Sequence, residues 1–437
     1  MTINKKIIEK LKQRSKDLQN NALYHTVLND NLAQVLEKQV YSQMKTADGR
    51  TDKTKLSINT NFLKKIVNKL SQLYTAVVSR NFGTSTERDK EIAAYYMKTM
   101  KLDSKLQRAT MLYNGTKSVL IELLYDSKYQ LGLRLIPNDS YFLYSDDENN
   151  LNELSHVIKI IDKEVAGIYT RYSYQIISAD TIVTVDFEGK ETDSKPNLLG
   201  FLPFVHVNSE LDSLFPRSDY DTLSTLLQCN SILTDANVSN YWSSFPITFG
   251  TNIDTSQLDF ERHPGAFYVL NPMPGSTQDP TISTVAPSLN TADSLALARE
   301  ILSGILDSKG IKLSSGDATS SIQSGVAALI DAADTSEVRK IIGNDWAYAE
   351  EELWAKIAEY HSWLVVNKLP LLPAKMPKTL FSDDFEVIVD FPLTNTHESD
   401  TVKEEVVDEV NKKVEEDGQE SPIEKDKVIV EEETEED

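Results

Sequence analysis

Only one cysteine, Cys229, occurs among the 437 residues of the chain. A single cysteine excludes an intramolecular disulfide and any zinc cluster built from cysteines, and it is typical of a protein made in a reducing cytosol. We expect Cys229 to fill a small space in the core.

Long apolar runs are also missing. The chain has no stretch of about 20 apolar residues such as a membrane helix requires, and its amino terminus, MTINKKIIEKLKQRSKD, lacks the apolar segment of a secretory signal. We therefore expect a soluble protein with no membrane partner. Residues 5–16 should form an ordinary solvated helix or arm, and a basic membrane-surface anchor is the alternative.

Positive charge is scarce. The formal net charge is −22, and between positions 398 and 437 there are 18 acidic and 5 basic residues. Binding of nucleic acid by bulk charge depends on Lys and Arg releasing counterions, so any contact with nucleic acid must be local or weak. Aliphatic residues become rare after Thr396, and we expect residues 398–437 to be an acidic, disordered tail; a partner-binding segment is the alternative.

Motifs for catalysis and metal binding are absent. The histidines form no HExxH or HxH pattern, no GxSxG or CxxC sequence occurs, and GTKS at 115–118 lacks the upstream glycine of a phosphate-binding loop. The acidic run DDE at 146–148 fits a solvated turn better than paired acid–base catalysis. We expect His206 and His361 to be packed, hydrogen-bonded residues. The sequence thus predicts a protein that is not an enzyme and has no cofactor or metal.

The first half of the chain contains helical patterns followed by strand patterns. Residues 1–45 are typical of a helix or a mobile arm. A helix is predicted over 61–80, where apolar residues recur every three or four positions, and over 91–113. From 117 to 207, short segments rich in β-branched and aromatic residues alternate with Asp, Asn, Gly or Pro, which predicts an antiparallel or mixed sheet. The fold class is therefore α+β.

In the second half, helices flank a β insertion. Ser218 is a suitable N-cap for a helix that runs to about Asn240. Pro and Gly over 245–287 predict a small β insertion, and the next helix begins at Thr291 and ends at Gly310. The Ser and Gly residues up to Gly325 predict a break, because both disfavour helix interiors.

A long helix is predicted over 326–368, with a bend at Gly343 and an end at Pro370, and a strand follows over 385–391. Three tryptophans lie on this helix. We place them in the core of the protomer, and contact with neighbouring protomers is the alternative; they are Trp346, Trp354 and Trp363.

The order of these segments resembles the portal proteins of tailed bacteriophages over most of residues 55–395. SINTNFLKKIVNKLSQLY looks like the helix that opens the portal wing, and YNGTKSVLIELLYDSKYQLGLRLIPNDSYFLY looks like the turn and strands that follow it. LGFLPFVHVNSELDSLFPRSDYDTLSTLL is similar to the strand and loop that lead into a capped helix. SIQSGVAAL resembles the start of the long helix, and FEVIVDFPLT the closing strand.

The resemblance implies an elongated portal-type protomer. Its parts would be an N-terminal helical arm (1–54), an α/β wing (55–210), a first stem helix (211–240), a β-containing clip (241–290), a second stem helix (291–309), a tunnel loop (310–325), a long helix with closing strand (326–397) and the acidic tail (398–437). The tail sequence VKEEVVDEVNKKVEED has little apolar surface, so the chain departs from the helical crown that usually tops a portal ring.

The resemblance also implies site residues. The tunnel loop would bring to a DNA channel Lys309, Lys312, Ser314, Ser315, Asp317, Ser320 and Gln323, and the clip would offer for docking Asp259, Glu261 and Arg262. In a ring the two lysines would form cationic circles. The alternative is that they stabilise the C-terminus of the preceding helix, which favours positive charge.

Portal subunits typically form a ring of twelve at one capsid vertex of the virion, and DNA passes through the ring during packaging and ejection. The resemblance therefore implies assembly in the cytoplasm of a bacterial host. The implied partners are further copies of the chain, the terminase large subunit, the major capsid and scaffolding proteins, a head–tail adaptor and double-stranded DNA. The alternatives are that the chain is itself a head–tail adaptor or other phage ring protein or, in another class, a metal-dependent nucleic-acid hydrolase.

Overall fold

The computed structural model describes residues 9–10, 14–39, 58–75, 78–83, 86–126, 130–146, 154–166, 169–209, 214, 219–243, 247–252, 273–275, 277, 281–285, 291–311 and 336–391. All of these lie in the first of two units into which the chain divides, residues 1–392. The predicted acidic tail, 398–437, lies outside the described residues.

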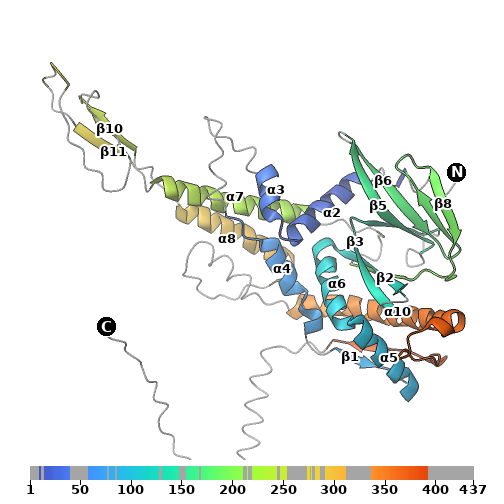
Figure 1. The fold of residues 1–437 in the computed structure, drawn as a ribbon. Coiled ribbons are helices and arrows are strands. Elements are labelled where there is room, and N and C mark those ends of the chain that lie inside the picture. Colours follow the sequence, from blue (N-terminus) through green and yellow to red (C-terminus); the bar gives the residue numbers. More distant parts are fainter. Residues whose placement is uncertain are drawn as a thin grey trace, which may run out of the picture. The chain divides into compact units, whose positions relative to one another are not determined.

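Helices and strands are both present, which confirms the α+β class (Figure 1). In chain order the elements are α2 (Ser15–Leu28), α3 (Leu32–Gln39), α4 (Phe62–Leu70), η3 (Gln72–Thr75), β1 (Ser79–Asn81), α5 (Glu87–Met100), α6 (Leu102–Thr116), β2 (Ser118–Asp126), β3 (Gln130–Pro137), β4 (Tyr141–Tyr144), β5 (His156–Ala166), β6 (Tyr169–Ile177), β7 (Thr181–Val185), β8 (Glu191–Pro196), β9 (Phe204–Asn208), α7 (Tyr220–Ser243), β10 (Ile247–Thr251), β11 (Thr281–Val285), α8 (Thr291–Ser308), α10 (Ser336–Lys368), η5 (Leu369–Leu371) and β12 (Ile388–Asp390).

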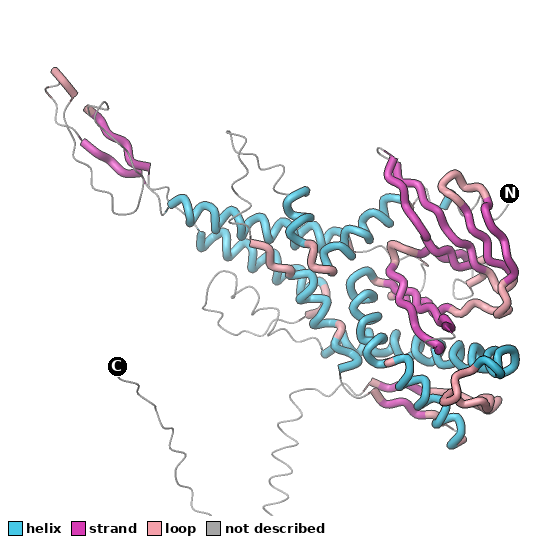
Figure 2. Tube along the Cα trace, in the orientation of Figure 1, coloured by secondary structure: helices cyan, strands magenta, loops and turns pink. Residues whose placement is uncertain are grey.

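The strand-rich region forms two sheets, one of three strands in the order β3-β2-β9 and one of five in the order β4-β5-β6-β7-β8 (Figure 2). Each strand pair in them is antiparallel, which settles the choice between an antiparallel and a mixed sheet for the described residues. The central strand β2 is buried from Ser118 to Leu123. Short connections between successive strands make this antiparallel arrangement the natural one.

The predicted helix over 61–80 is shorter in the structure, because side chains from α6 capture its backbone. The carbonyl of Ser71 accepts hydrogen bonds from Gln107 Nε2 and from Thr110 Oγ1 (3.1 Å), and Gln107 Oε1 accepts from the N–H of Tyr74 (2.9 Å). These bonds replace the next helical turn. The chain then tightens into η3 and continues as β1, which pairs with β12.

The helical stretch over 91–113 is also divided in two. Lys101 has a φ of 53°, a left-handed conformation that ends α5 and begins α6. A capping box at Thr86 and Asp89 fixes the start of α5, with the Thr86 N–H donating to Asp89 Oδ2 at 2.9 Å.

The two helices within the predicted N-terminal arm pack into the body of the protein. Tyr24 and Val27 of α2 and Leu36 of α3 are buried in one core with apolar side chains of α4, α7 and α8. The Asn61 side chain, which caps α4, also donates to the carbonyl of Val27 at 2.7 Å. Residues 15–39 are therefore part of the folded core where they are described.

The long helix α10 is described from Ser336 and ends at Lys368, immediately before Pro370, as predicted. It continues through Gly343, which packs against Leu73 and Phe391: a Cβ at Gly343 would lie 3.7 Å from an atom of each. Gly343 thus lets Leu73 and Phe391 approach the helix backbone closely. The part of the predicted helix before Ser336 lies outside the described residues.

The closing strand is shorter than predicted. The structure assigns only Ile388–Asp390 to β12. Phe385 instead follows a turn, in which its N–H donates to the carbonyl of Ser382 at 3.1 Å, and its ring packs on Phe381 with centroids 4.2 Å apart. Aromatic packing, with the turn, holds this residue out of the sheet.

Candidate functional site

The helices α7 and α8 form an antiparallel pair. Along the sequence, β10 and β11 lie between them. Cys229 Sγ on α7 lies 3.6 Å from the carbonyl oxygen of Ala298 on α8. Lys309, which follows α8, pairs with Asp219, which precedes α7. The start of one helix therefore lies beside the end of the other. Figure 1 shows the two helices side by side, and β10 pairs with β11 in an antiparallel register.

Asp219 begins α7. Its Oδ1 accepts a hydrogen bond from the backbone N–H of Thr222 at 3.3 Å, and its carbonyl accepts from the N–H of Leu223 at 3.1 Å. This is the bonding of an N-cap residue. The predicted cap, Ser218, lies outside the described residues, and the structure gives the capping role to its neighbour.

Gly310 ends α8, as the sequence predicts. Its φ is +68°, its N–H donates to the carbonyl of Asp307 at 3.0 Å, and the N–H of Ile311 donates to the carbonyl of Leu306 at 2.9 Å. Ile311 and Leu306 are both buried. These features define a Schellman motif, in which a left-handed glycine satisfies the last carbonyls and an apolar contact closes the turn. The chain is thereby turned sharply at the point where the described residues stop.

Lys309 and Asp219 form an ion pair in which each side chain is 25% exposed. Partial burial by itself raises the pKa of Asp219, but hydrogen bonds from Lys309 and Thr222 outweigh it, so the pKa lies below its ordinary value. The ammonium of Lys309 therefore contacts a carboxylate at the end of the helix pair where α7 begins and α8 ends. This end, around Asp219 and Lys309, is called the foot of the helix pair below. The ammonium also neutralises charge at the C-terminus of α8.

The remaining predicted site residues lie outside the described part of the chain. They are Lys312, Ser314, Ser315, Asp317, Ser320 and Gln323 of the predicted tunnel loop and Asp259, Glu261 and Arg262 of the predicted clip. Of the candidates, the structure thus places Lys309 alone, and it adds the partner of this lysine, Asp219.

The foot of the helix pair is held by a continuous apolar core. Leu223, Leu227 and Leu233 of α7 and Leu302 and Leu306 of α8 are buried together with residues of α2, α3 and α4. Cys229 belongs to this core, as predicted, and burial raises the pKa of its thiol to about 11. Such a thiol is inert at neutral pH.

His361 is a satisfied core histidine, as predicted. It is fully buried, accepts at Nδ1 a hydrogen bond from the hydroxyl of Tyr96 (2.7 Å) and donates from Nε2 to the carbonyl of Thr379 (2.8 Å). This places its proton on Nε2. His206 is packed edge-on against Tyr141, and burial lowers its pKa to about 3. Its Nε2 is buried without a hydrogen-bond partner among the described residues, so the prediction for His206 is confirmed in its packing and not in its hydrogen bonding. Both rings are neutral at physiological pH.

A buried charge cluster joins β1, α6 and α10. Arg80 Nε donates to Glu350 Oε1 at 2.5 Å, and Glu350 also accepts from the Tyr74 hydroxyl at 2.9 Å and from the Trp354 indole at 3.3 Å. Asp103 contacts the other end of the Arg80 guanidinium at 2.5 Å. The Glu350 side chain has no exposed surface. Since each oxygen of the carboxylate is bonded, the cluster positions these elements and offers no free base.

The tryptophans of α10 contact this same protomer. Trp346 and Trp354 are buried, and Trp346 packs edge-on against Tyr74 and Tyr113. Trp363 is half-buried and donates from its indole to the carbonyl of Leu198 at 2.9 Å. The prediction that they fill the protomer core is confirmed for Trp346 and Trp354.

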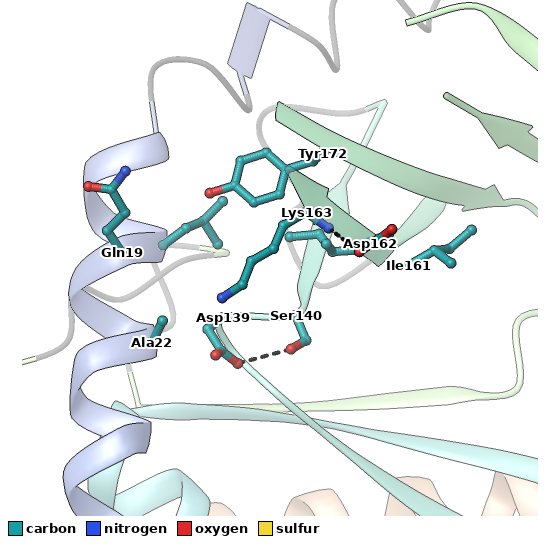
Figure 3. A pocket seen from close by; sticks show the side chains of 10 residues that line it. Gln19, Ala22, Asp139, Ser140, Ile161, Asp162, Lys163 and Tyr172 are labelled. Carbon is teal, nitrogen blue, oxygen red and sulfur yellow. Dashed lines mark hydrogen bonds between the residues drawn. The ribbon is translucent and has the colours of Figure 1, made fainter. Parts of the chain in front are cut away.

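A groove of about 550 Å³ lies between α2 and the five-stranded sheet (Figure 3). Gln19 and Ala22 face it from the helix, and Ser140, Lys163 and Tyr172 face it from the other side. The Ser140 hydroxyl donates to the neighbouring carboxylate of Asp139 at 3.0 Å. The groove is thus lined by polar as well as apolar side chains.

Within the described part of the chain, no three His, Cys, Asp or Glu side chains are grouped so as to hold a metal ion. None of the helices over the same residues is long and apolar enough to cross a membrane.

No protein-family model matches the chain, and no curated protein matches it. Among the solved structures that are similar to it at low sequence identity are two parts of gene transfer agent particles. One, from the virion of a native gene transfer agent particle, is 10% identical in sequence and has a TM-score of 0.36. The match covers 83% of this chain and 90% of the chain in that structure. The other, from the neck of an empty gene transfer agent particle computed with C6 symmetry, is 12% identical in sequence and has a TM-score of 0.32. The match covers 85% of this chain and 93% of the chain in that structure.

Proposed function

We propose that the chain is a structural subunit of a phage-type virion and, more specifically, a portal protein that forms a ring around a DNA channel. The α7–α8 pair carries this proposal. Its foot is capped by Asp219, pinned by Lys309 and closed by the Gly310 turn, and β10 and β11 lie between its two helices in the sequence. The pair would be the stem, and the β strands part of the clip.

The charge of the helix pair suits a channel for a moving polyanion. From Tyr220 to Ser243 the sequence has two acidic residues and no Lys or Arg, and from Thr291 to Ser308 it has three acidic residues and Arg299. A surface with few cations releases few counterions and therefore holds DNA weakly. A passage that must let DNA move in both directions benefits from this weak attraction.

In the proposed ring, residues 310–325 would line the narrowest part of the channel as the tunnel loop. The polypeptide enters this segment from the turn at Gly310, and α10, whose core face is buried against the protomer, begins further along the chain at Ser336. Lys312 is the cation of this segment that would meet phosphates.

The proposed role requires no catalytic activity of the subunit and no cofactor. Its partners would be further copies of the chain, the terminase large subunit, the capsid and scaffolding proteins, a head–tail adaptor and double-stranded DNA, at one vertex of the capsid. The clip would make the docking contacts with the motor and the adaptor.

Electron microscopy of the purified full-length chain tests the proposal. The expected images show closed rings with a central opening, and incorporation of such rings at a single vertex of assembled capsids would separate a portal from a head–tail adaptor, which joins after DNA packaging. Images of dispersed single protomers at concentrations that support capsid assembly would contradict the proposal.

A further inference from the structure

The α7–α8 pair has a groove on the face that the protomer leaves open. It measures about 520 Å³, and its lining includes Asp221 and Thr225 of α7 and Leu297, Glu300 and Gly304 of α8. Leu297 is 48% exposed, although an apolar side chain of this size gains stability from burial. The groove therefore combines an apolar floor with acidic groups.

Gly304 shapes this groove. It is exposed within a continuous helix, and a Cβ at this position would have open space around it, with no atom within 4 Å. Glycine in a helix interior costs about 1 kcal/mol relative to alanine, and nothing inside the protomer requires it here. A glycine at such a position lets another chain approach the helix backbone closely.

The opposite side of the same helical layer is basic. The α7 residues that line the groove, such as Asp221 and Thr225, point away from Leu223 and Leu226, which are buried against α4. On the far side of that core, α4 has the sequence FLKKIVNKL, with no acidic residue, and buries its apolar face. Its polar face is thus turned outward, away from the groove.

The outward face of α4 carries two lysines. Lys64 pairs with Asp30, while Lys65 is half-exposed and forms no ion pair with a carboxylate of the described residues. The start of α10 lies beside α4, since Arg339 Nη2 donates to the carbonyl of Lys69 at 2.9 Å, and it adds the exposed Lys340, with Glu337 one turn before it. Lys65 and Lys340 together are called the basic face below.

We propose that the α7–α8 groove receives the basic face of a second copy of this chain, with Lys65 of that copy set against Glu300 and Asp221. This inference rests on the proposed ring and names the surfaces that would join its subunits. Patches of opposite charge on opposite sides of one layer cannot pair with themselves. They join copies head to tail, which is the type of contact that closes into a ring.

The apolar floor and the open backbone at Gly304 supply the close contact in this interface, and the charges set its direction. Opposite charges across an interface mainly select the partner and speed the encounter, whereas the packed centre holds the complex. The contact should therefore tolerate loss of one charge better than loss of space at Gly304.

Gly304→Leu tests the packed contact. The substitution fills the groove, and its Cβ would have no other atom within 4 Å. Leucine is also a better helix former than glycine, so Tm of the separated protomer should rise by about 2 °C. Native mass measurement should nevertheless show loss of the ring and accumulation of the 49.2 kDa protomer. Ser104→Leu, which adds the same side chain to an exposed position of α6, is the matched control and should leave the ring unchanged.

A charge exchange tests the pairing independently. Glu300→Lys and Lys65→Glu should each reduce the ring fraction at low salt by at least tenfold, and the double variant should recover it, because both changes then meet at every contact. Rings formed by Gly304→Leu as well as by the wild type would show that the groove is not the interface. A double variant that forms as few rings as the single variants would show the same. Either result would leave the proposed ring itself intact. A wild-type chain that forms no ring overturns the proposed function, and this inference with it.

Discussion

Lys309 donates a hydrogen bond to the carboxylate of Asp219 across the foot of the α7–α8 pair, ninety positions away in the sequence. Asp219 has two tasks, since it also accepts the N–H of Thr222 as the N-cap of α7. One carboxylate thus caps the start of α7 and binds the lysine that follows α8.

Removing each partner should separate these two tasks. Asp219→Ala loses the cap and the ion pair and should lower the free energy of unfolding by about 2 kcal/mol, whereas Lys309→Met loses the pair alone and should cost about 1 kcal/mol or less. Urea unfolding of both variants measures the difference. Lys90→Met, which breaks the exposed pair with Glu87, is the control and should change little. Equal costs for the two foot variants would show that the cap contributes nothing.

The ion pair should also depend on pH in a known direction. The pKa of Asp219 is lower in the folded protein than its ordinary value, so the unfolded state takes up a proton first as the pH falls. The stabilisation is then complete above about pH 4 and is lost as the pH falls through the folded pKa. Wild type and Lys309→Met should accordingly converge in stability below about pH 4. A difference that stays constant down to pH 3 would contradict the assignment.

The buried cluster around Glu350 should dominate the stability of the region that joins β1 to α10. Glu350→Ala leaves the Arg80 guanidinium, which is 7% exposed, without its buried carboxylate, and should cost about 4 kcal/mol. Glu359→Ala removes the partner of Lys356 on an accessible part of the same helix and should cost no more than about 0.5 kcal/mol. Thermal unfolding compares the two. Similar costs would mean that the cluster is not held as the structure shows.

Local patterns in the sequence predict much of this fold, and contacts between distant residues explain where they fail. Gly310 and Pro370 end their helices because glycine and proline act on the backbone next to them. The helix over 61–80 stops early because Gln107 and Thr110 bond to Ser71, and no local signal announces that contact. The charge cluster was missed for the same reason: Arg80 and Glu350 are 270 positions apart.

The candidate site likewise has features that local sequence predicts and features that depend on contacts between distant residues. The break after α8 and the β insertion before it are visible in composition, because Ser, Gly and Pro disfavour regular structure locally. The capping role of Asp219 was not predicted, because Ser218 and Asp219 are both good N-cap residues and adjacent. Lys309 binds Asp219, and only the antiparallel packing of the helices brings these two residues together.

The two lysines of the predicted channel should behave differently in DNA packaging. Lys309 lies on Asp219, so Lys309→Gln should leave DNA packaging and retention close to wild type while lowering stability. Lys312→Gln should leave ring assembly intact and alter packaging or retention, because a cation lining the channel would touch phosphates transiently. Capsid filling with both variants measures this. Unchanged packaging with Lys312→Gln, alone and combined with Lys309→Gln, would remove the channel role from these residues.

The central claim is that the chain assembles into a closed ring, and the native mass of the full-length protein tests it most directly. The account predicts one discrete species at a fixed multiple of 49.2 kDa, near twelve subunits, that persists on dilution because a closed ring has no free end from which to lose subunits. A single species at 49.2 kDa, or an open-ended series of masses without a preferred number, would contradict it.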